Sequence, residues 1–373
     1  MSRLLKITRD VDRITVGLWK FRFSLTLRNR QTQRRIDHAP ILHLMFNDKF
    51  NAPFCDFLNR HFSPKEHLVI YKKCTPGFPM PDAENVLAVT KVTKYRYDSP
   101  TLKKIICHSL CLSEFETLFY EHPDLLKKAY WVIWGGDLYD AEKTRKKDFV
   151  RKHFAGYFGA IDRDYAVAKY GMKGPFFDTF NAIPVDFNVL GAVVDTPRSR
   201  IQVQVNNSCD KSTLAMLDIL AKFRDRGIYV TTVVSYGDLE YKEAILAKGR
   251  TLFGDRFLPV ETYLSPEQYA AHLAQNAILV MNQDRQQGIG NIVASLFLGQ
   301  KVYVRSSISI GRYLRERDMA IYLTEDIPHA TFEEFCANAA VAQNQAGIQE
   351  LFGEPSYVRR WQEAFGAIRR VGE

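Results

Sequence analysis

The sequence predicts an α/β protein with two doubly wound domains that face a cleft. Short apolar strands alternate with amphipathic helices along the chain, a pattern typical of βαβ units and a mainly parallel sheet. The series starts twice, once on each side of a polar segment at 194–200 that contains Pro197. A chain of 373 residues is also long enough for two or three domains of ordinary size.

The first series covers residues 39–195, which we assign to an N-terminal domain. Helical spacing appears at 52–62, and Ser113 with Glu116 predicts a capping box that opens a helix reaching about residue 122. Strands are expected around Ile183 and at 41–46, 68–71, 86–92, 104–107, 130–134 and 159–161.

The second series covers residues 196–345, which we assign to a C-terminal domain. Ser265 precedes Pro266, an arrangement typical of a helix start in which serine is the cap and proline the first helical residue. Residues 346–373 follow as a last helical segment. Strands are expected at 201–205, 228–234, 257–259, 277–281, 301–304 and 320–322.

The positive charge of the protein is concentrated at one end. The net charge is +9, and residues 1–38 carry ten Lys and Arg against three Asp, so this extension holds +7 and the rest only +2. From Phe21 to Arg28 apolar and polar residues alternate, which predicts a strand with one apolar face. The extension is either a solvated segment partly packed on the body or a docking element for anionic lipid headgroups. Nucleic acid is the least favoured partner.

Composition argues against several classes of protein. An aromatic content of 13% argues against a disordered chain. The six cysteines form no C-x-x-C pair and are too few for a disulfide framework, which disfavours zinc ribbons and favours a reducing compartment. No apolar run approaches the roughly 20 residues of a membrane span. The sequence also contains no Walker A loop, H-E-x-x-H or G-x-S-x-G motif.

Three loops of the second series follow strands at the edge where open α/β sheets bind ligands. Residues 285–290 read RQQGIG and precede a helix. Here glycines admit a ligand close to the backbone, helix-start amides suit phosphate and Arg285 adds a charge; the alternative is a tight structural turn. The loop 206–210 is either a helix cap or a contact for a diphosphate or a base. In the third loop, Tyr236 and Gly237, the tyrosine can stack on a nucleobase.

Polar residues also end strands of the first series. Asp137 follows a buried strand and two glycines. Three roles fit this position: a general base, a group that binds a sugar hydroxyl, or a helix cap. His108 ends the strand at 104–107, where a lone histidine is more often structural than functional. Asp48 is a similar candidate with less support.

At these loops the sequence resembles the bacterial 4-acetamido-4,6-dideoxygalactose (Fuc4NAc) transferases of enterobacterial common antigen synthesis. The resemblance covers roughly residues 43–367 and is stronger after Trp131. The loop Val205–Ser212 matches the family's V-G-N-S-x-D-x-S, with Asn206 in place of the glycine. The other matching blocks are WVIWGGDLYD at 131–140, the segment from Tyr269 through RQQGIG, and Pro355-Ser356-Tyr357 with Trp361.

The resemblance implies a two-domain GT-B fold, no metal or other cofactor, and a dTDP-activated sugar donor. It further implies a lipid-diphosphate-linked saccharide acceptor at the cytoplasmic face of the bacterial inner membrane, with the protein bound peripherally. The segment 346–373 is then expected to cross back to the first domain, and Asn206 to narrow the approach to the phosphates. By position, Asp137 and His108 fall on the acceptor side. The donor side takes Asn207, Ser208, Asp210, Ser212, Gln286, Gln287, Gly288 and Gly290, beside Tyr236, Gly237 and Arg285.

Other functions are still open on the sequence alone. A glycosyltransferase with a UDP donor and a different acceptor fits the same residues. The basic extension supports a non-catalytic nucleotide-sugar or nucleic-acid binding protein instead. An epimerase is disfavoured because Val293 occupies the third glycine position of G-x-G-x-x-G. The D-x-D triplets at 10–12 and 162–164, which metal-dependent glycosyltransferases use, are too short to carry weight alone.

Overall fold

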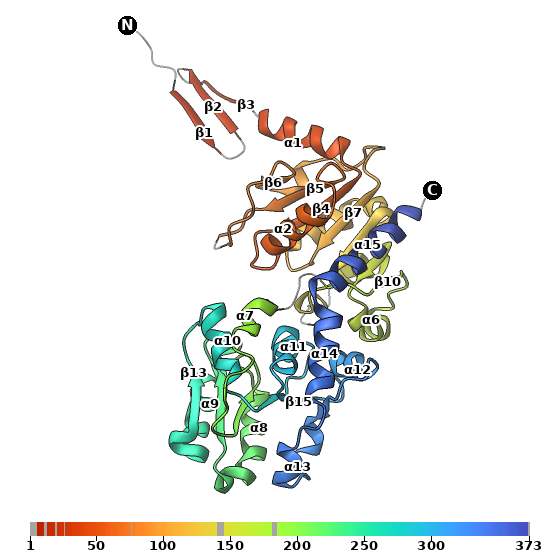
Figure 1. The fold of residues 1–373 in the computed structure, drawn as a ribbon. Coiled ribbons are helices and arrows are strands. Elements are labelled where there is room, and N and C mark those ends of the chain that lie inside the picture. Colours follow the sequence, from red (N-terminus) through yellow and green to blue (C-terminus); the bar gives the residue numbers. More distant parts are fainter. Residues whose placement is uncertain are drawn as a thin grey trace. The chain divides into compact units, whose positions relative to one another are not determined.

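The computed structural model divides the chain into two compact units. Unit 1 comprises residues 1–182 and 358–373, and unit 2 comprises residues 183–357. Each unit contains a parallel sheet accompanied by helices (Figure 1). The structure describes residues 6–10, 13–18, 21–25, 27–75, 77–139, 145–180 and 185–371.

The main sheet of unit 1 has seven parallel strands in the order β10-β9-β8-β7-β4-β5-β6. The strands expected between residues 41 and 134 are confirmed, with shifts of a few residues at their ends. The one expected at 159–161 lies earlier, because Gly159 (φ +131°) turns the chain into the 3₁₀ turn η3 (Ala160–Asp162). The expected strand around Ile183 falls partly outside the described residues. The strands are β4 (Ile41–Phe46), β5 (His67–Lys72), β6 (Val86–Val89), β7 (Lys104–His108), β8 (Ala129–Val132), β9 (Gly156–Phe158) and β10 (Phe176–Phe177).

Helices alternate with these strands, and one of them begins differently from the expectation. The capping box predicted for Ser113 and Glu116 is wrong, because Ser113 makes no cap bond and Glu116 is buried in an ion pair with Arg151 (3.2 Å). A buried carboxylate requires such a partner, which outweighs a local cap. The helices are α2 (Asn51–His61), α3 (Ser113–Glu121), α4 (Gly136–Tyr139), α5 (Arg145–His153) and α6 (Arg163–Tyr170).

Three histidines form a hydrogen-bonded chain inside unit 1. They lie on the neighbouring strands β5, β4 and β7, and ring nitrogens of His43 are 2.9 Å from His67 and 3.0 Å from His108. Trp361 and Phe365, on the part of α15 (Glu354–Arg370) that belongs to unit 1, pack on these rings. Burial lowers the pKa of His67 and His108 to about 3, and that of His43 well below its usual value. All three rings are therefore neutral near neutral pH.

Unit 2 contains six parallel strands in the order β13-β12-β11-β14-β15-β16. All six expected strands are confirmed within two residues. Ser265 caps its helix as predicted, in a capping box with Gln268 and with Pro266 in the first turn. The strands are β11 (Gln202–Val205), β12 (Tyr229–Val233), β13 (Phe257–Val260), β14 (Ile278–Met281), β15 (Lys301–Val304) and β16 (Tyr322–Leu323).

The helices of unit 2 are mostly the connections between its parallel strands. After β16 the chain forms two separate helices, α13 and α14, before α15 begins. The helices are α7 (Phe187–Gly191), α8 (Ser212–Leu220), α9 (Lys242–Phe253), α10 (Pro266–Ala274), α11 (Ile289–Phe297), α12 (Ser309–Arg315), α13 (Phe332–Cys336) and α14 (Val341–Phe352).

The division between the units falls between residues 182 and 183, earlier than the boundary at 195–196 that the polar segment indicates. The reason is α7, whose Leu190 packs with Leu273 and Ala294 in one apolar cluster of unit 2. At the other end, residues 358–373 group with unit 1.

The basic end of the chain contains three antiparallel strands and one helix. These are β1 (Lys6–Asp10), β2 (Arg13–Leu18), β3 (Phe21–Leu25) and α1 (Leu27–His38). β3 confirms the strand expected from the alternating pattern. Gln33 fixes α1 to the body, because its amide donates to the carbonyl of Arg96 (3.0 Å) and accepts from the same residue's N–H (2.9 Å). No helix among the described residues has the length and hydropathy to cross a bilayer.

The buried histidine chain predicts a specific pH dependence of stability. His108 titrates near 6.5 in the unfolded chain and about 3 in the fold, so the unfolded state binds more protons between these values and stability falls as pH falls through 6.5. Between about pH 7.5 and pH 5.5 this costs about 1.4 kcal/mol. In urea titrations His108→Asn should lose that much less stability than the wild type over this range.

The exposed His38 provides the control, since His38→Asn should follow the wild type at both pH values. Buried carboxyl groups with raised pKa values, Asp137 and Asp162, give the opposite pH dependence, which cancels in the comparison. Parallel pH profiles for wild type and His108→Asn would contradict a neutral, buried His108.

Candidate functional site

Three loops meet at the carboxyl edge of the unit 2 sheet. β11 pairs with β12 on one side and β14 on the other, so the strand order reverses here, as at the ligand sites of open α/β sheets. The N–H of Cys209 donates to the carbonyl of Tyr236 (2.8 Å), and the N–H of Asp238 donates to that of Cys209 (2.9 Å). The loops after β11 and β12 are thereby joined.

Asn206 links the loop after β11 to the end of β14 and the start of α8. It adopts a left-handed conformation (φ +55°), which asparagine tolerates better than most residues. Its side-chain amide donates to the hydroxyls of Ser212 (3.1 Å) and Thr213 (2.9 Å), and its oxygen accepts from the N–H of Asn282 (2.7 Å). The expectation that Asn206 narrows the approach to phosphates is wrong, because the side chain is fully buried in these bonds.

The residue after it, Asn207, and its neighbour Ser208 line the loop. The Asn207 amide lies 3.5 Å from the hydroxyl of Tyr236, which is 47% exposed. The Ser208 hydroxyl accepts from the amide of Gln283 (3.0 Å). Four predicted residues of the two loops, Asn207, Ser208, Tyr236 and Gly237, are therefore brought together.

Asp210 and Ser212 have the structural role that the sequence left open. One carboxylate oxygen of Asp210 accepts from the N–H (2.8 Å) and the hydroxyl (2.6 Å) of Ser212, at the start of α8. The Ser212 hydroxyl also accepts from Asn206. Both side chains hold the loop in shape and are engaged within the protein.

Gly288 sets the start of α11. It has φ +67°, and a Cβ there would lie 2.5 Å from Met281 Cε and 3.0 Å from Asn207 Cγ, so glycine is strongly favoured here. The first turn of α11, with Gly290, presents backbone N–H groups that have no partner within the helix, which suits an anion. Arg285 and Gln287 lie partly exposed just before it.

Polar atoms without a partner gather at this edge. Among the described residues, Asn207 Oδ1, Gln283 Oε1 and Gln286 Nε2 are buried and accept or donate no hydrogen bond. Buried polar groups are normally paired, so this grouping is typical of a ligand site. Gln286 is oriented by its other amide atom, which accepts from the N–H of Ile310 (2.9 Å). Gln283 was not among the residues predicted from the sequence, although its place just after β14 is a usable signal.

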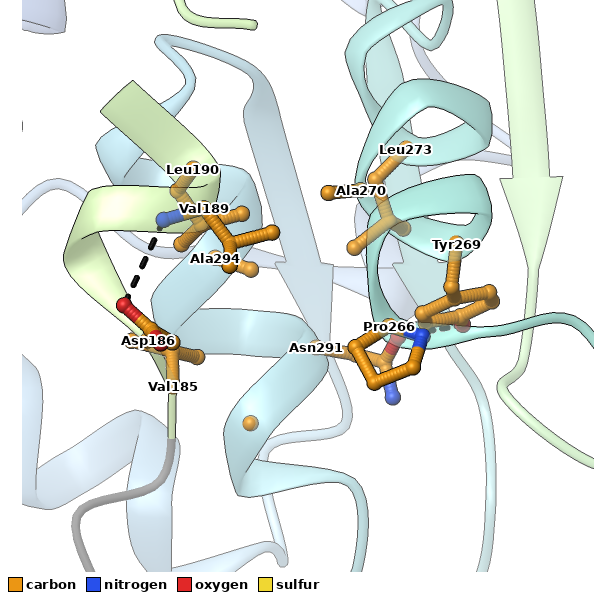
Figure 2. Close-up of a pocket in the computed structure, with 11 residues that line it drawn as sticks. Val185, Asp186, Val189, Leu190, Pro266, Tyr269, Ala270, Leu273, Asn291 and Ala294 are labelled. Carbon is orange, nitrogen blue, oxygen red and sulfur yellow. Dashed lines mark hydrogen bonds between the residues drawn. The ribbon is translucent and has the colours of Figure 1, made fainter. Parts of the chain in front are cut away.

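An apolar pocket of about 270 Å³ adjoins the start of α11. Figure 2 shows Val189 and Leu190 of α7 opposite Ala270 and Leu273 of α10. Tyr269 is fixed at its rim, because its hydroxyl contacts Asn291 of α11 and accepts from Gln204 (3.3 Å). The remaining lining residues are Val185, Asp186, Pro266, Gly290 and Ala294.

In unit 1, Asp137 is buried and organises the carboxyl edge of the sheet. Its carboxylate accepts from the N–H of Leu110 (2.9 Å), the indole of Trp131 (2.8 Å) and the N–H of Trp134 (3.0 Å). Burial raises its pKa, and these hydrogen bonds oppose that rise. The contacts tie the ends of β7 and β8 together, which favours a positioning role over proton transfer.

The other two candidates of unit 1 are His108 and Asp48. His108 has no exposed surface and faces the interior of the histidine chain, so it offers nothing to a ligand in this conformation. Asp48 accepts from the N–H of Phe50 (3.1 Å) in the turn that leads into α2. Local capping therefore accounts for Asp48.

Asp162 is a further buried carboxylate, which was noted in the sequence only as part of a D-x-D triplet. It follows β9 at the same sheet edge, is 6% exposed and accepts from the hydroxyl of Tyr139 (2.8 Å). Burial raises its pKa to about 7, with a further contribution from the charge of Asp137. Asp164 is exposed, so the triplet does not present two carboxylates together. The described residues contain no group of three or more His, Cys, Asp or Glu placed to hold a metal ion.

No protein-family model matches the chain. Solved structures similar to it include Anabaena HepE in complex with UDP and glucose (12% identity, TM-score 0.62, 88% of this chain and 100% of that one). A glycosyltransferase from Rickettsia africae is similar too (8% identity, TM-score 0.61, 89% and 99%). A putative UDP-N-acetylglucosamine 2-epimerase from Listeria monocytogenes is less so (9%, TM-score 0.53, 90% and 98%).

These likenesses confirm the expected fold class. The chain has an α/β fold of the GT-B type, with a parallel sheet of seven strands and another of six. It is structurally similar to nucleotide-sugar glycosyltransferases, and identities near 10% carry the comparison no further than the fold.

Gly237 offers a direct test of the loop arrangement. A Cβ at this residue (φ +98°) would lie 2.4 Å from the carbonyl oxygen of Cys209, so Gly237→Ala must push the two loops apart. We expect the binding of a nucleoside diphosphate, tested with both dTDP and UDP by isothermal titration, to weaken by about tenfold, the loss of one good hydrogen bond or more.

Gly191→Ala is the matched control, because an added Cβ there meets nothing within 4 Å. It should bind dTDP like the wild type. Wild-type affinity in a folded Gly237→Ala would show that the joined loops do not form the nucleotide site.

Proposed function

We propose that the protein is a glycosyltransferase that moves a deoxy-amino sugar of the Fuc4NAc type from a dTDP-sugar to a lipid-diphosphate-linked saccharide. The observation that carries this is the carboxyl edge of unit 2, where buried unpaired polar atoms surround the glycine-led start of α11. The GT-B fold supports it. In this proposal the reaction needs no metal ion or cofactor.

The donor's diphosphate lies at the first turn of α11 in this proposal. The free N–H groups there, the amide of Gln286 and the charge of Arg285 offset the negative charge that develops as the bond to the sugar breaks. Asn207 and Ser208 approach the diphosphate from the loop after β11. The exposed ring of Tyr236 stacks on the base.

The pocket between α7, α10 and α11 takes the transferred sugar. Its walls are largely apolar, and a deoxy-amino sugar carries two methyl groups, one on the ring and one in its acetamido group. Asn291 and the rim around Tyr269 supply polar contacts. About 270 Å³ is ample for one pyranose ring.

Asp162 is the base that accepts the proton of the acceptor hydroxyl. That oxygen bonds to the anomeric carbon while the bond from this carbon to the diphosphate breaks, and the nucleoside diphosphate leaves. A carboxyl group whose pKa lies near 7 is well matched to this task. Asp137 then acts as a positioning residue for the loops beside it.

Two features of the proposal involve a membrane: the lipid-linked acceptor and the basic residues 1–38. The charge of +7 in this extension complements anionic headgroups, and the protein would then act peripherally at the cytoplasmic face of the inner membrane. The likeness to a putative epimerase keeps that reaction as a second candidate. Epimerisation of a UDP-sugar in the absence of an acceptor would favour an epimerase. Sugar transfer from UDP-sugars but not from dTDP-sugars would show that the donor nucleotide is UDP.

Filling the sugar pocket should separate sugar binding from nucleotide binding. Ala294→Leu places a larger side chain in the pocket, so we expect KM for the dTDP-sugar to rise about tenfold, the effect of about 1.4 kcal/mol. The affinity for dTDP itself should stay unchanged. Ala247→Leu, at an exposed site on α9, is the control. If Ala294→Leu weakens the binding of dTDP and of the dTDP-sugar equally, the pocket binds the base and not the sugar.

The role of Asp162 predicts a pH profile for transfer. Asp162→Asn should lower kcat by a factor of about 100 or more while dTDP binding is kept. In Tyr139→Phe the ionised carboxylate loses a hydrogen bond, so the pKa of Asp162 rises and the acidic limb of kcat/KM shifts to higher pH. An unshifted limb in an active Tyr139→Phe would exclude Asp162 as the base.

A further inference from the structure

A second hollow lies at the opposite edge of the unit 1 sheet from the carboxylates. Its volume is about 520 Å³, and it surrounds the amino-terminal ends of β4, β7 and β8. Five of its nine lining residues are cations and only one is an acid. The lining residues are Pro40, Ile41, Glu66, Lys103, Lys104, Lys127, Lys128, Arg369 and Val371.

Two of these lysines are held within the protein without a carboxylate. Lys104 is 7% exposed, and its ammonium donates to the carbonyl of Val371. The ammonium of Lys128 donates to the carbonyls of Tyr97 (2.8 Å) and Leu102 (2.9 Å). Carbonyl groups orient an ammonium but leave its charge uncompensated. Among the described residues, no carboxylate lies within ion-pair distance of either one.

The neighbouring charges do not neutralise the hollow. Lys127 pairs with Asp124 (2.8 Å) and Arg369 with Glu66 (2.6 Å), which leaves three lysines in excess. Burial lowers the pKa of Lys104 and Lys128. Lys103 lowers that of Lys128 further by repulsion, although Asp98 opposes this. The ammonium groups of Lys103 and Lys128 thus lie close enough to repel each other, and burial disfavours the charge of Lys104; a bound anion offsets both costs.

We propose that this hollow is a binding site for a phosphate-bearing anion. Several lysines lining one hollow suit the charge of a phosphate group and its three or four oxygens. The same chemistry is offered by the headgroup of an anionic phospholipid and by a soluble phosphate ester. The site lies in unit 1 and shares no residue with the proposed donor site, so it is independent of the proposed activity.

Site-resolved acetylation tests the proposal on the full-length protein. The protein is treated briefly with acetic anhydride and the acetylated lysines are mapped by peptide mass spectrometry. One arm adds inorganic pyrophosphate, a second adds phosphatidylglycerol vesicles, and the reference arms use sodium chloride of equal ionic strength and phosphatidylcholine vesicles. We expect Lys103 to be protected about fivefold or more in at least one anionic arm. Lys173, an exposed lysine of the same unit, should react equally in every arm.

Lys103→Glu supplies the matched variant, because this side chain is exposed and we expect its replacement to keep the fold, which circular dichroism checks. It should reduce protection of Lys128 to the level of the reference arms, whereas Lys173→Glu should not. Protection by pyrophosphate alone identifies a soluble ester, and protection by vesicles alone identifies a lipid headgroup. The proposal is overturned if Lys103 is protected in neither arm, if Lys173 is protected equally, or if Lys103→Glu has no effect.

Discussion

Parallel pairing of the strands is the constraint on which the rest of this structure depends. Because every strand of a main sheet runs the same way, all carboxyl ends share one edge and all amino ends the other. Asn206 and Asn282, far apart in sequence, therefore meet beyond β11 and β14. The same constraint places Asp137 and Asp162 after adjacent strands, and gathers lysines where β7 and β8 begin.

Hydrogen bonding then separates the polar residues that shape a site from those left for a ligand. The side chains of Asn206, Asp137 and Asp210 are all hydrogen-bonded within the protein, and each holds a loop in one conformation. The entropy cost of ordering these loops is therefore met on folding and not on ligand binding. Asn207, Gln283 and Gln286 each keep one buried atom unpaired. In the proposed donor site, groups held in place in this way need not rearrange when a charged ligand binds, which lets them stabilise developing charge.

Local sequence patterns were enough for most of the fold. Apolar runs and their spacing predicted the strands of the two main sheets apart from β9 and β10, because buried parallel strands are apolar throughout. Such local patterns could not predict contacts between residues that are distant in sequence. The Glu116–Arg151 pair removed an expected cap, and Gly159 ended a strand early. In the site, the loops could be predicted but the direction of each side chain could not. The sequence did not indicate that the Asn206 side chain points into the protein. It also did not indicate the burial that raises the pKa of Asp162.

Unit 1 is assembled from two stretches of chain, whereas unit 2 is continuous. During synthesis, all of unit 2 is therefore made before the last part of unit 1 exists. Until residues 358–373 appear, the surface that Trp361 and Phe365 cover, including the histidine chain, lacks those two rings. Domains made continuously can fold as units on the ribosome. Synthesis therefore completes the sequence of the C-terminal unit before that of the N-terminal unit, and the first unit to begin is the last to receive all of its residues.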